Sequence, residues 1–121
     1  MELQQKGLGD AVLARASGRI DLSNADAFTT ALSAALIGTK SALILDLSNV
    51  DYMSSAGLRA LMITLKASKT ENKSFGVAAL QPMLTEIFSI ARLSQVIPVF
   101  PTTRDAVAKL APDALVQFDG S

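Results

Sequence analysis

Residues 42–61 have the sequence ALILDLSNVDYMSSAGLRAL, and the prediction of the fold starts from this strand–loop–helix unit. Its opening segment, residues 42–47, is almost entirely apolar, which is typical of a strand covered on both faces of a parallel sheet. A polar loop and two serines follow, and apolar residues then recur at helical spacing. Because Ser54 or Ser55 can cap a helix, the unit predicts a buried strand, a loop and a helix over about residues 56–70.

Apolar and amphipathic stretches alternate on both sides of this unit. Towards the N-terminus, residues 2–6 and 11–17 predict two strands joined by a turn, and a helix with capping-box-like spacing begins at Ser23. Towards the C-terminus, residues 75–80 and 96–100 predict two further strands, each followed by a helix. This order predicts an α/β fold, in which a mixed, mostly parallel β-sheet is packed with about four α-helices.

The length of 121 residues corresponds to one ordinary domain. We expect this domain to cover residues 1–112 and residues 113–121 to form a flexible C-terminal tail. Pro98 removes a backbone donor from its strand, so that strand is predicted at an edge of the sheet.

The composition excludes several kinds of chemistry. The chain has no Cys and no His, which removes disulfides, thiolate metal sites and any Ser-His-Asp triad. It also has no Gly-x-Ser-x-Gly elbow and no glycine-rich phosphate loop. We therefore predict no metal, no cofactor and no enzymatic activity. Lys and Arg balance Asp and Glu at 11 each, so we expect no direct binding to nucleic acid.

Neither a membrane span nor a secretory signal is predicted. The longest uncharged stretch, residues 27–39, is shorter than the roughly 20 apolar residues that a spanning helix needs. The N-terminal sequence MELQQKGLGD lacks a basic segment followed by an apolar run. We therefore expect a cytoplasmic protein that does not insert into a membrane.

The candidate site lies where the central strand passes into the following helix. Open α/β sheets usually place functional groups at the carboxyl ends of their strands, and a helix N-terminus favours negative charge. Spacing alone favours a simple capping role for Ser54 or Ser55, with phosphorylation as the less frequent alternative. Asp46 has two readings of similar weight, as a structural hydrogen-bond acceptor or as support for the site.

The whole pattern closely resembles that of anti-sigma-factor antagonists, small bacterial proteins built on the STAS domain. Residues 46–48 (Asp-Leu-Ser) and 54–59 (Ser-Ser-Ala-Gly-Leu-Arg) match the family's central motif. Residues 18–21 (Gly-Arg-Ile-Asp) are similar to its turn before the first helix, and residues 97–102 are similar to its final strand. The resemblance covers about residues 2–111.

The resemblance implies a function in signal transduction by partner switching. In this family the serine two residues before the glycine, here Ser55, is phosphorylated by an anti-sigma factor that is also a serine kinase. The implied protein binds that anti-sigma factor, frees a sigma factor for transcription, and is switched off by phosphorylation. Many members have Asp immediately before the modified serine, whereas this chain has Ser54, which is the alternative site of phosphorylation.

The implied partner surface surrounds this turn, because loops at the carboxyl ends of neighbouring strands converge. We expect Met53 to be exposed there and Gly57 to allow close approach of the partner to the backbone. The expected partner-binding residues are Asp21, Met53, Ser54, Ser55, Gly57, Leu58 and Arg59. An alternative function within the same fold is that of a STAS subunit of a lipid-transporting ABC system or of a signalling scaffold. The oligomeric state is left open by the sequence.

Overall fold

The structure is a computed structural model that describes residues 1–120, and its centre is a five-stranded sheet in the order β1-β2-β3-β4-β5. The strands are β1 (Glu2–Leu8), β2 (Ala11–Ile20), β3 (Ala42–Met53), β4 (Ser74–Ala78) and β5 (Val99–Phe100). The β1–β2 pair is antiparallel, and every other pair is parallel. The predicted α/β class and the mixed, mostly parallel sheet are therefore confirmed.

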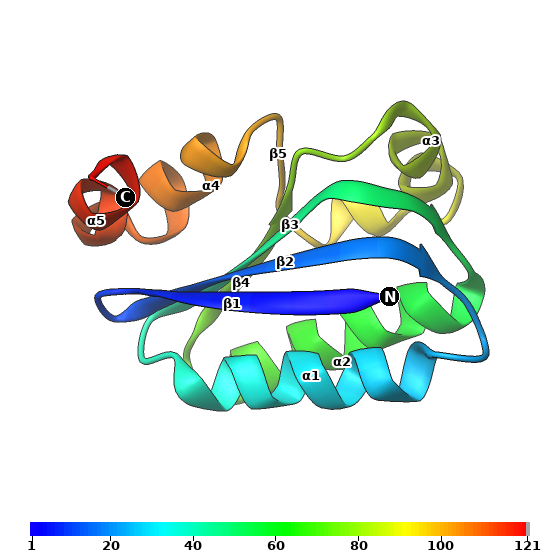
Figure 1. Cartoon of the computed structure of the whole chain (residues 1–121), viewed down its shortest axis with the longest axis horizontal. Coiled ribbons are helices and arrows are strands. Elements are labelled where there is room, and N and C mark those ends of the chain that lie inside the picture. Colours follow the sequence, from blue (N-terminus) through cyan, green and yellow to red (C-terminus); the bar gives the residue numbers. More distant parts are fainter. Residues whose placement is uncertain (121) are drawn as a thin grey trace.

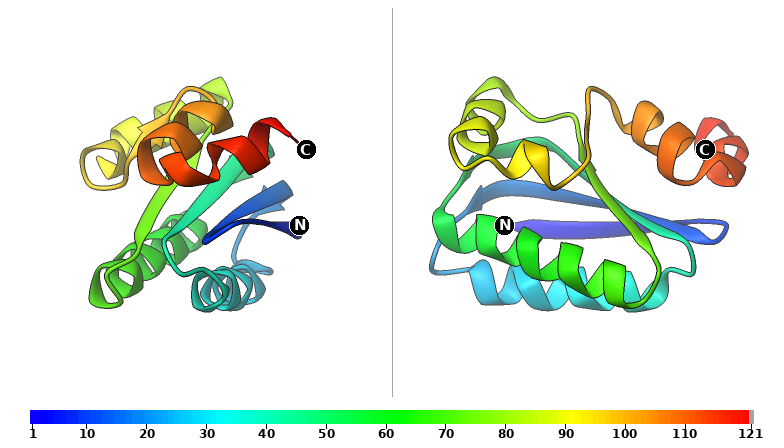
Figure 2. Two further views of the ribbon diagram at one scale, coloured as in Figure 1. Left: turned by 90° about the vertical axis from the view of Figure 1, so that its left-hand side faces the viewer. Right: turned by 180° about the vertical axis from the view of Figure 1, so that it is seen from behind.

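Helices cover both faces of the sheet (Figures 1 and 2). They are α1 (Ala25–Gly38), α2 (Ser55–Thr70), α3 (Pro82–Ile90), α4 (Thr103–Leu110) and α5 (Leu115–Asp119), with single 3-10 turns η1 (Leu93–Gln95) and η2 (Pro112–Ala114). The pair α1 and α2 lies side by side on one face, and α3, α4 and α5 lie on the opposite side. The described chain thus has five α-helices, where about four were expected.

Two hydrophobic clusters hold these layers together. The larger contains Phe28 and Leu32 of α1 and Leu61 of α2, and it extends to Phe88 of α3. The smaller cluster contains Ala106 and Val107 of α4, packed on side chains of β1, β2, β3 and β4. The larger cluster thus joins α1 and α2 to α3, and the smaller one lies under α4. Both faces of the sheet are therefore covered by helices, as the continuous apolar run at residues 42–47 predicted.

The paired strands β2 and β3 are longer than predicted. β2 continues past residue 17 to Ile20, with register shifts on either side of Gly18, whose φ is +88°. β3 continues past residue 47 to Met53, and Val50 and Met53 are buried although the residues between them are polar. The extensions form because each strand gives the other its backbone hydrogen-bond partners, which local polarity does not reveal.

The C-terminal segment is folded, so the expected flexible tail is wrong for residues 113–120; Ser121 lies outside the described residues. Ala114 is 4% exposed and belongs to the smaller hydrophobic cluster. Arg104 Nε and Nη2 donate to the two carboxylate oxygens of Asp119, each at 3.1 Å. The segment is ordered because Ala114 and Leu115 pack against the apolar cluster beside α4.

Local sequence signals mark the beginnings of two helices and fail at a third. Thr102 Oγ1 accepts from Asp105 N at 3.1 Å at the start of α4, and Pro82 begins α3. Ser23 does not cap α1, because Asn24 occupies the capping position and Ser23 N donates instead to Asp21 Oδ1 at 3.0 Å.

Candidate functional site

The site is built where the carboxyl ends of β2 and β3 meet. Ile20 pairs with Met53 in the parallel ladder, and Ser54 N donates to Ile20 O at 2.9 Å. Asp21 and Ser54 follow these paired residues directly, so they are neighbours although 33 positions separate them in the sequence. Figure 1 shows both connections at the right-hand end, where β2 leads into α1 and β3 leads into α2.

The two serines of the motif have different environments. Ser54 has extended backbone angles (φ −78°, ψ 173°) and caps α2, because its Oγ accepts from Gly57 N at 3.5 Å. Ser55 is the first helical residue and is exposed. Its hydroxyl makes no hydrogen bond to any residue within 1–120. Ser54 therefore has the structural role, and Ser55 presents a hydroxyl that is free of partners among the described residues.

The loop before α1 is held by hydrogen bonds around Asp21. Ser23 donates to the Asp21 carboxylate from both its hydroxyl and its backbone N–H, and Arg19 Nε lies 3.3 Å from Asp21 Oδ2. Asn24 Oδ1 accepts from Asp21 N at 3.0 Å, and Asn24 Nδ2 donates to Arg19 O at 2.9 Å. The hydrogen bond from the Ser23 side chain, followed by the other donors, lowers the pKa of Asp21 below its ordinary value. The site therefore carries a fixed negative charge beside the serines.

Three further residues of this end were not singled out as site residues from the sequence. The Arg19 guanidinium lies 4.3 Å from the centre of the Tyr52 ring, a cation–π contact that joins the ends of β2 and β3. This contact depends on the register of the strands, which local patterns do not give. Leu22, next to Asp21, is 84% exposed. The sequence could have revealed Leu22, because it is an apolar residue between Asp21 and Ser23 that does not fit the periodicity of the following helix.

Met53 and Gly57 are buried, which corrects two expectations. Met53 is 1% exposed, so the predicted exposed methionine is wrong. Its side chain points into the core because β3 continues through residue 53 and places it on the buried face. A Cβ at Gly57 would lie 2.5 Å from Met53 Cγ and 2.9 Å from Ile20 Cγ2. The glycine is therefore needed for packing within the domain, and its lack of a side chain is already explained without a partner.

Leu58 and Arg59 differ in their exposure to solvent. Leu58 is half-buried and packs against the larger hydrophobic cluster, whereas Arg59 is exposed. The outward surface at this end therefore consists of Asp21, Leu22, Ser54, Ser55, part of Leu58 and Arg59, which we call the serine surface.

Asp46 lies elsewhere in the molecule. Its carboxylate accepts from Arg15 Nε at 3.1 Å, Ser48 N at 2.8 Å and Thr103 Oγ1 at 3.0 Å, and it thereby ties β2, β3 and α4 together. Burial raises the pKa of Asp46, but the hydrogen bonds from Ser48, Arg15 and Thr103 outweigh it and leave the pKa below its ordinary value. At about 3.3 Å per strand residue, Asp46 lies roughly 25 Å along β3 from Ser54. The structural reading of Asp46 is therefore favoured, and a direct role at the serine surface is wrong.

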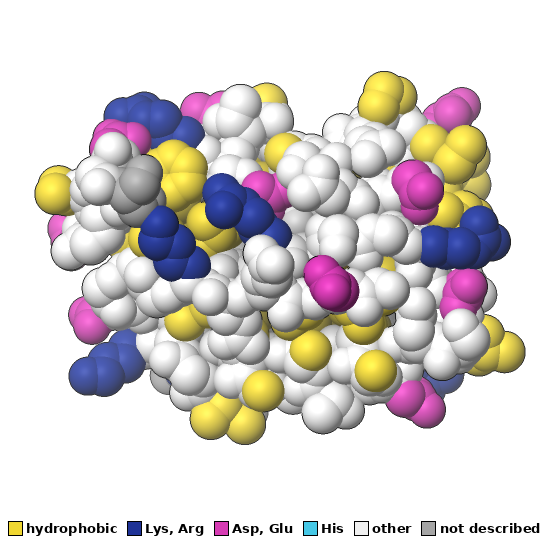
Figure 3. Space-filling model, in the orientation of Figure 1, with side chains coloured by type: hydrophobic (Ala, Val, Ile, Leu, Met, Phe, Trp, Pro, Cys, Tyr) yellow, Lys and Arg dark blue, Asp and Glu magenta, His cyan; other side chains and the backbone are white. Residues whose placement is uncertain are grey.

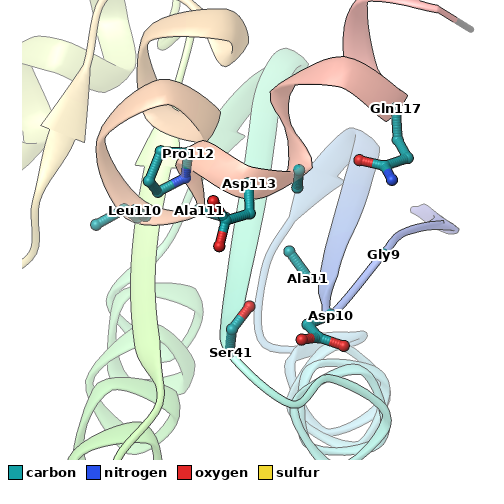
Figure 4. Close-up of a pocket in the computed structure, with 10 residues that line it drawn as sticks. Gly9, Asp10, Ala11, Ser41, Leu110, Ala111, Pro112, Asp113 and Gln117 are labelled. Atoms are coloured by element: carbon teal, nitrogen blue, oxygen red, sulfur yellow. The ribbon is translucent and has the colours of Figure 1, made fainter.

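A hollow of about 380 Å³ lies at the opposite end of the sheet, between the β1–β2 turn and the C-terminal helices. Figure 4 shows Asp10, Ser41, Asp113 and Gln117 around it. Both carboxylates are exposed to solvent. The hollow shares no residue with the serine surface.

The charge pattern, the acidic groups and the apolar helices of residues 1–120 are as follows. On the face in Figure 3, Lys and Arg side chains alternate with Asp and Glu and form no continuous basic patch. Within residues 1–120, no group of three or more His, Cys, Asp or Glu side chains is placed to hold a metal ion. No helix in that part of the chain is both long enough and apolar enough to span a bilayer.

These features of fold and site agree with the comparison to known protein families. The model of the STAS domain matches residues 2–106, and the chain belongs to the STAS-domain family, with the anti-sigma factor antagonists among its relatives. BtrV of Bordetella bronchiseptica, provisionally named an anti-sigma factor antagonist, is 28% identical over 115 residues, covering 95% of this chain and 98% of BtrV.

Solved structures show the same fold. An anti-sigma factor antagonist from Mycobacterium paratuberculosis superimposes with a TM-score of 0.82 at 28% identity, covering 90% of this chain and 92% of that one. Unphosphorylated SpoIIAA, also an anti-sigma factor antagonist, superimposes with a TM-score of 0.76 at 14% identity, covering 92% and 97% of the two chains. At that identity the second similarity concerns the fold alone.

Proposed function

We propose that this chain is an anti-sigma factor antagonist that binds an anti-sigma factor with serine kinase activity and is released when Ser55 is phosphorylated. The observation that carries the proposal is the exposed hydroxyl of Ser55 at the start of α2, which no residue among 1–120 binds, beside a Ser54 that is already used as the cap. The names of the relatives from Bordetella and Mycobacterium support the anti-sigma factor as the class of partner.

The serine surface has the mixture of groups that protein partners bind. Leu22 is 84% exposed and adds apolar area next to Asp21, and Arg59 adds an exposed positive charge on α2. An exposed apolar side chain with polar and charged neighbours is a common feature of interaction sites. Asp21 and Ser54 are fixed by the ladder between β2 and β3, so a partner would meet a surface that is already ordered.

The phosphoryl transfer itself would be catalysed by the partner. The Ser55 Oγ attacks the γ-phosphorus of a nucleoside triphosphate bound to the kinase, forming the new O–P bond as the bond to the β,γ-bridging oxygen breaks. The nucleoside diphosphate leaves, and the hydroxyl proton passes to a base of the kinase. Ser55 meets the steric demand of this reaction because it is exposed on the first turn of the helix. This chain acts as the substrate and needs no catalytic group of its own.

Phosphorylation would change the surface while leaving the fold in place. The phosphate adds about 1.5 to 2 negative charges at neutral pH, at a helix end where negative charge is tolerated. A partner packed against the unmodified turn would then have to accommodate a hydrated dianion next to Asp21. Like-charge contacts at interfaces cost several kcal/mol, and about 2.8 kcal/mol already corresponds to a 100-fold loss of affinity.

The test is capture of the partner by purified wild type, Ser55→Ala, Ser55→Asp and Ser54→Ala proteins, followed by identification of the captured protein. We expect wild type, Ser55→Ala and Ser54→Ala to capture an anti-sigma factor with a kinase domain. Ser55→Asp should capture much less of it while melting like wild type. Equal capture by Ser55→Asp, or capture of a transporter subunit in place of the kinase, would overturn the proposal.

A further inference from the structure

Arg59 is an exposed cation that lies one helical turn after Ser55. It forms no hydrogen bond or ion pair with any residue in the described range 1–120. Three other arginines are paired, since Arg15, Arg19 and Arg104 lie within 3.1 to 3.3 Å of Asp46, Asp21 and Asp119. The guanidinium of Arg59 is therefore available to a new anion without loss of an existing contact.

The helix places Ser55 and Arg59 on the same outward face. Both residues are exposed, whereas Gly57, Ala60 and Leu61 of the same turns are buried. Residues four apart on a helix are surface neighbours, with about 5–6 Å between their Cβ atoms. Helical side chains also lean towards the N-terminus, so the long side chain of Arg59 can reach back to the turn that contains Ser55.

No other charged side chain competes for this position within the start of α2. The first turn of the helix contains no acidic residue, and Arg59 is the one charged residue between Ser55 and Thr64. An anion that precedes its cation by four positions is also the favoured order on a helix. The planar guanidinium can donate two parallel hydrogen bonds to a phosphate group.

We propose that Arg59 binds the phosphate of phosphorylated Ser55 in an intrahelical ion pair. The inference rests on the proposed function, because that function places the phosphate on Ser55. Formation of the pair breaks no covalent bond and leaves the guanidinium protonated. Phosphorylation would then change the serine surface twice, since it adds negative charge at Ser55 and withdraws the positive charge of Arg59 from a partner.

The experiment uses the full chain with phosphoserine incorporated at position 55 during synthesis, so that no kinase is involved. The phosphate is titrated by phosphorus NMR in the wild-type background and in Arg59→Gln, Arg59→Lys and Lys66→Gln. Lys66 is the matched control, because it is an exposed cation on the same helix and lies about 16 Å from Ser55 along the helix axis. That distance exceeds the screening length of about 8 Å at physiological ionic strength.

An ion pair with Arg59 favours the dianion, so the phosphate should lose its second proton at lower pH when Arg59 is present. From the strength of such pairs, we expect a midpoint about 0.3 pH unit lower in wild type and Lys66→Gln than in Arg59→Gln. Arg59→Lys should restore most of this difference, since it keeps the charge. Identical midpoints in wild type and Arg59→Gln would overturn the ion pair.

A second readout excludes an effect of unfolding. The unphosphorylated Arg59→Gln protein should melt like wild type, because the side chain is exposed and unpaired among residues 1–120. The Nε–H signal of Arg59 should shift when position 55 carries phosphoserine, and an unchanged signal would contradict the pair. Because the phosphate is installed without a kinase, these failures would leave the proposed function standing. Failure of that function would appear instead as kinase labelling at another residue.

Discussion

Replacing Gly57 by alanine should destabilise the domain, although alanine is the better helix former. The added Cβ would lie 2.5 Å from Met53 Cγ and 2.9 Å from Ile20 Cγ2, closer than carbon atoms pack. Neither contact is with the far end of a flexible side chain, so the ends of β2 and β3 would have to move. Overpacking of this kind costs about 1–3 kcal/mol. Helix propensity returns up to about 1 kcal/mol, which leaves a net loss of up to about 2 kcal/mol.

Gly38→Ala is the matched control. Gly38 is also helical, and nothing lies within 4 Å of a Cβ built on it. The two variants gain similar helix propensity, so the difference in their free energies of unfolding isolates the steric term, about 1–3 kcal/mol. Urea denaturation followed by circular dichroism measures both values. If Gly57→Ala proves as stable as Gly38→Ala, the packing of Met53 and Ile20 against residue 57 is described wrongly.

Three further predictions concern stability. Asp46→Ala should cost about 2–3 kcal/mol, because it removes the acceptor of three hydrogen bonds, and urea denaturation checks this value; little or no loss would contradict the structural role. Because the pKa of Asp46 is lowered in the folded state, the stability that this carboxylate contributes is present above the ordinary pKa of 3.8 and is lost as the pH falls below it. Asp46→Asn should therefore flatten the acid limb of a plot of melting temperature against pH. An acid limb as steep as that of wild type would refute the role of Asp46 in acid stability. Deletion of residues 112–121 should lower the melting temperature and increase binding of a hydrophobic dye, because it exposes the apolar cluster to which Ala114 belongs. A truncated chain that melts like the full one would show that the segment adds nothing to stability.

The sequence predicted the elements whose signals are local. Thr102 and Pro82 mark the beginnings of α4 and α3, and Ser54 caps α2, because each of these roles depends on residues only a few positions away. The convergence of Asp21 and the serines also followed from general rules for parallel strands. These rules require only the order of strands and helices, and the hydrophobic pattern of the sequence predicts that order.

The errors concern features that depend on distant partners. Met53 is buried because β3 pairs with β2 as far as residue 53, and a polar neighbourhood in the sequence does not reveal that pairing. The segment after Pro112 folds because the second face of the sheet is otherwise incompletely covered. The contact between Arg19 and Tyr52 depends on the strand register after a bulge. None of these partners lies within a window of local sequence.

The proposed function requires that Ser55, and not Ser54, is the modified residue. The most direct measurement incubates the full chain with its partner kinase and a nucleoside triphosphate and locates the phosphate by fragmentation mass spectrometry. We expect one phosphate on Ser55 in wild type and in Ser54→Ala, and none in Ser55→Ala. The free hydroxyl of Ser55 and the capping role of Ser54 lead to this result. A phosphate on Ser54, or undiminished labelling of Ser55→Ala, would contradict it.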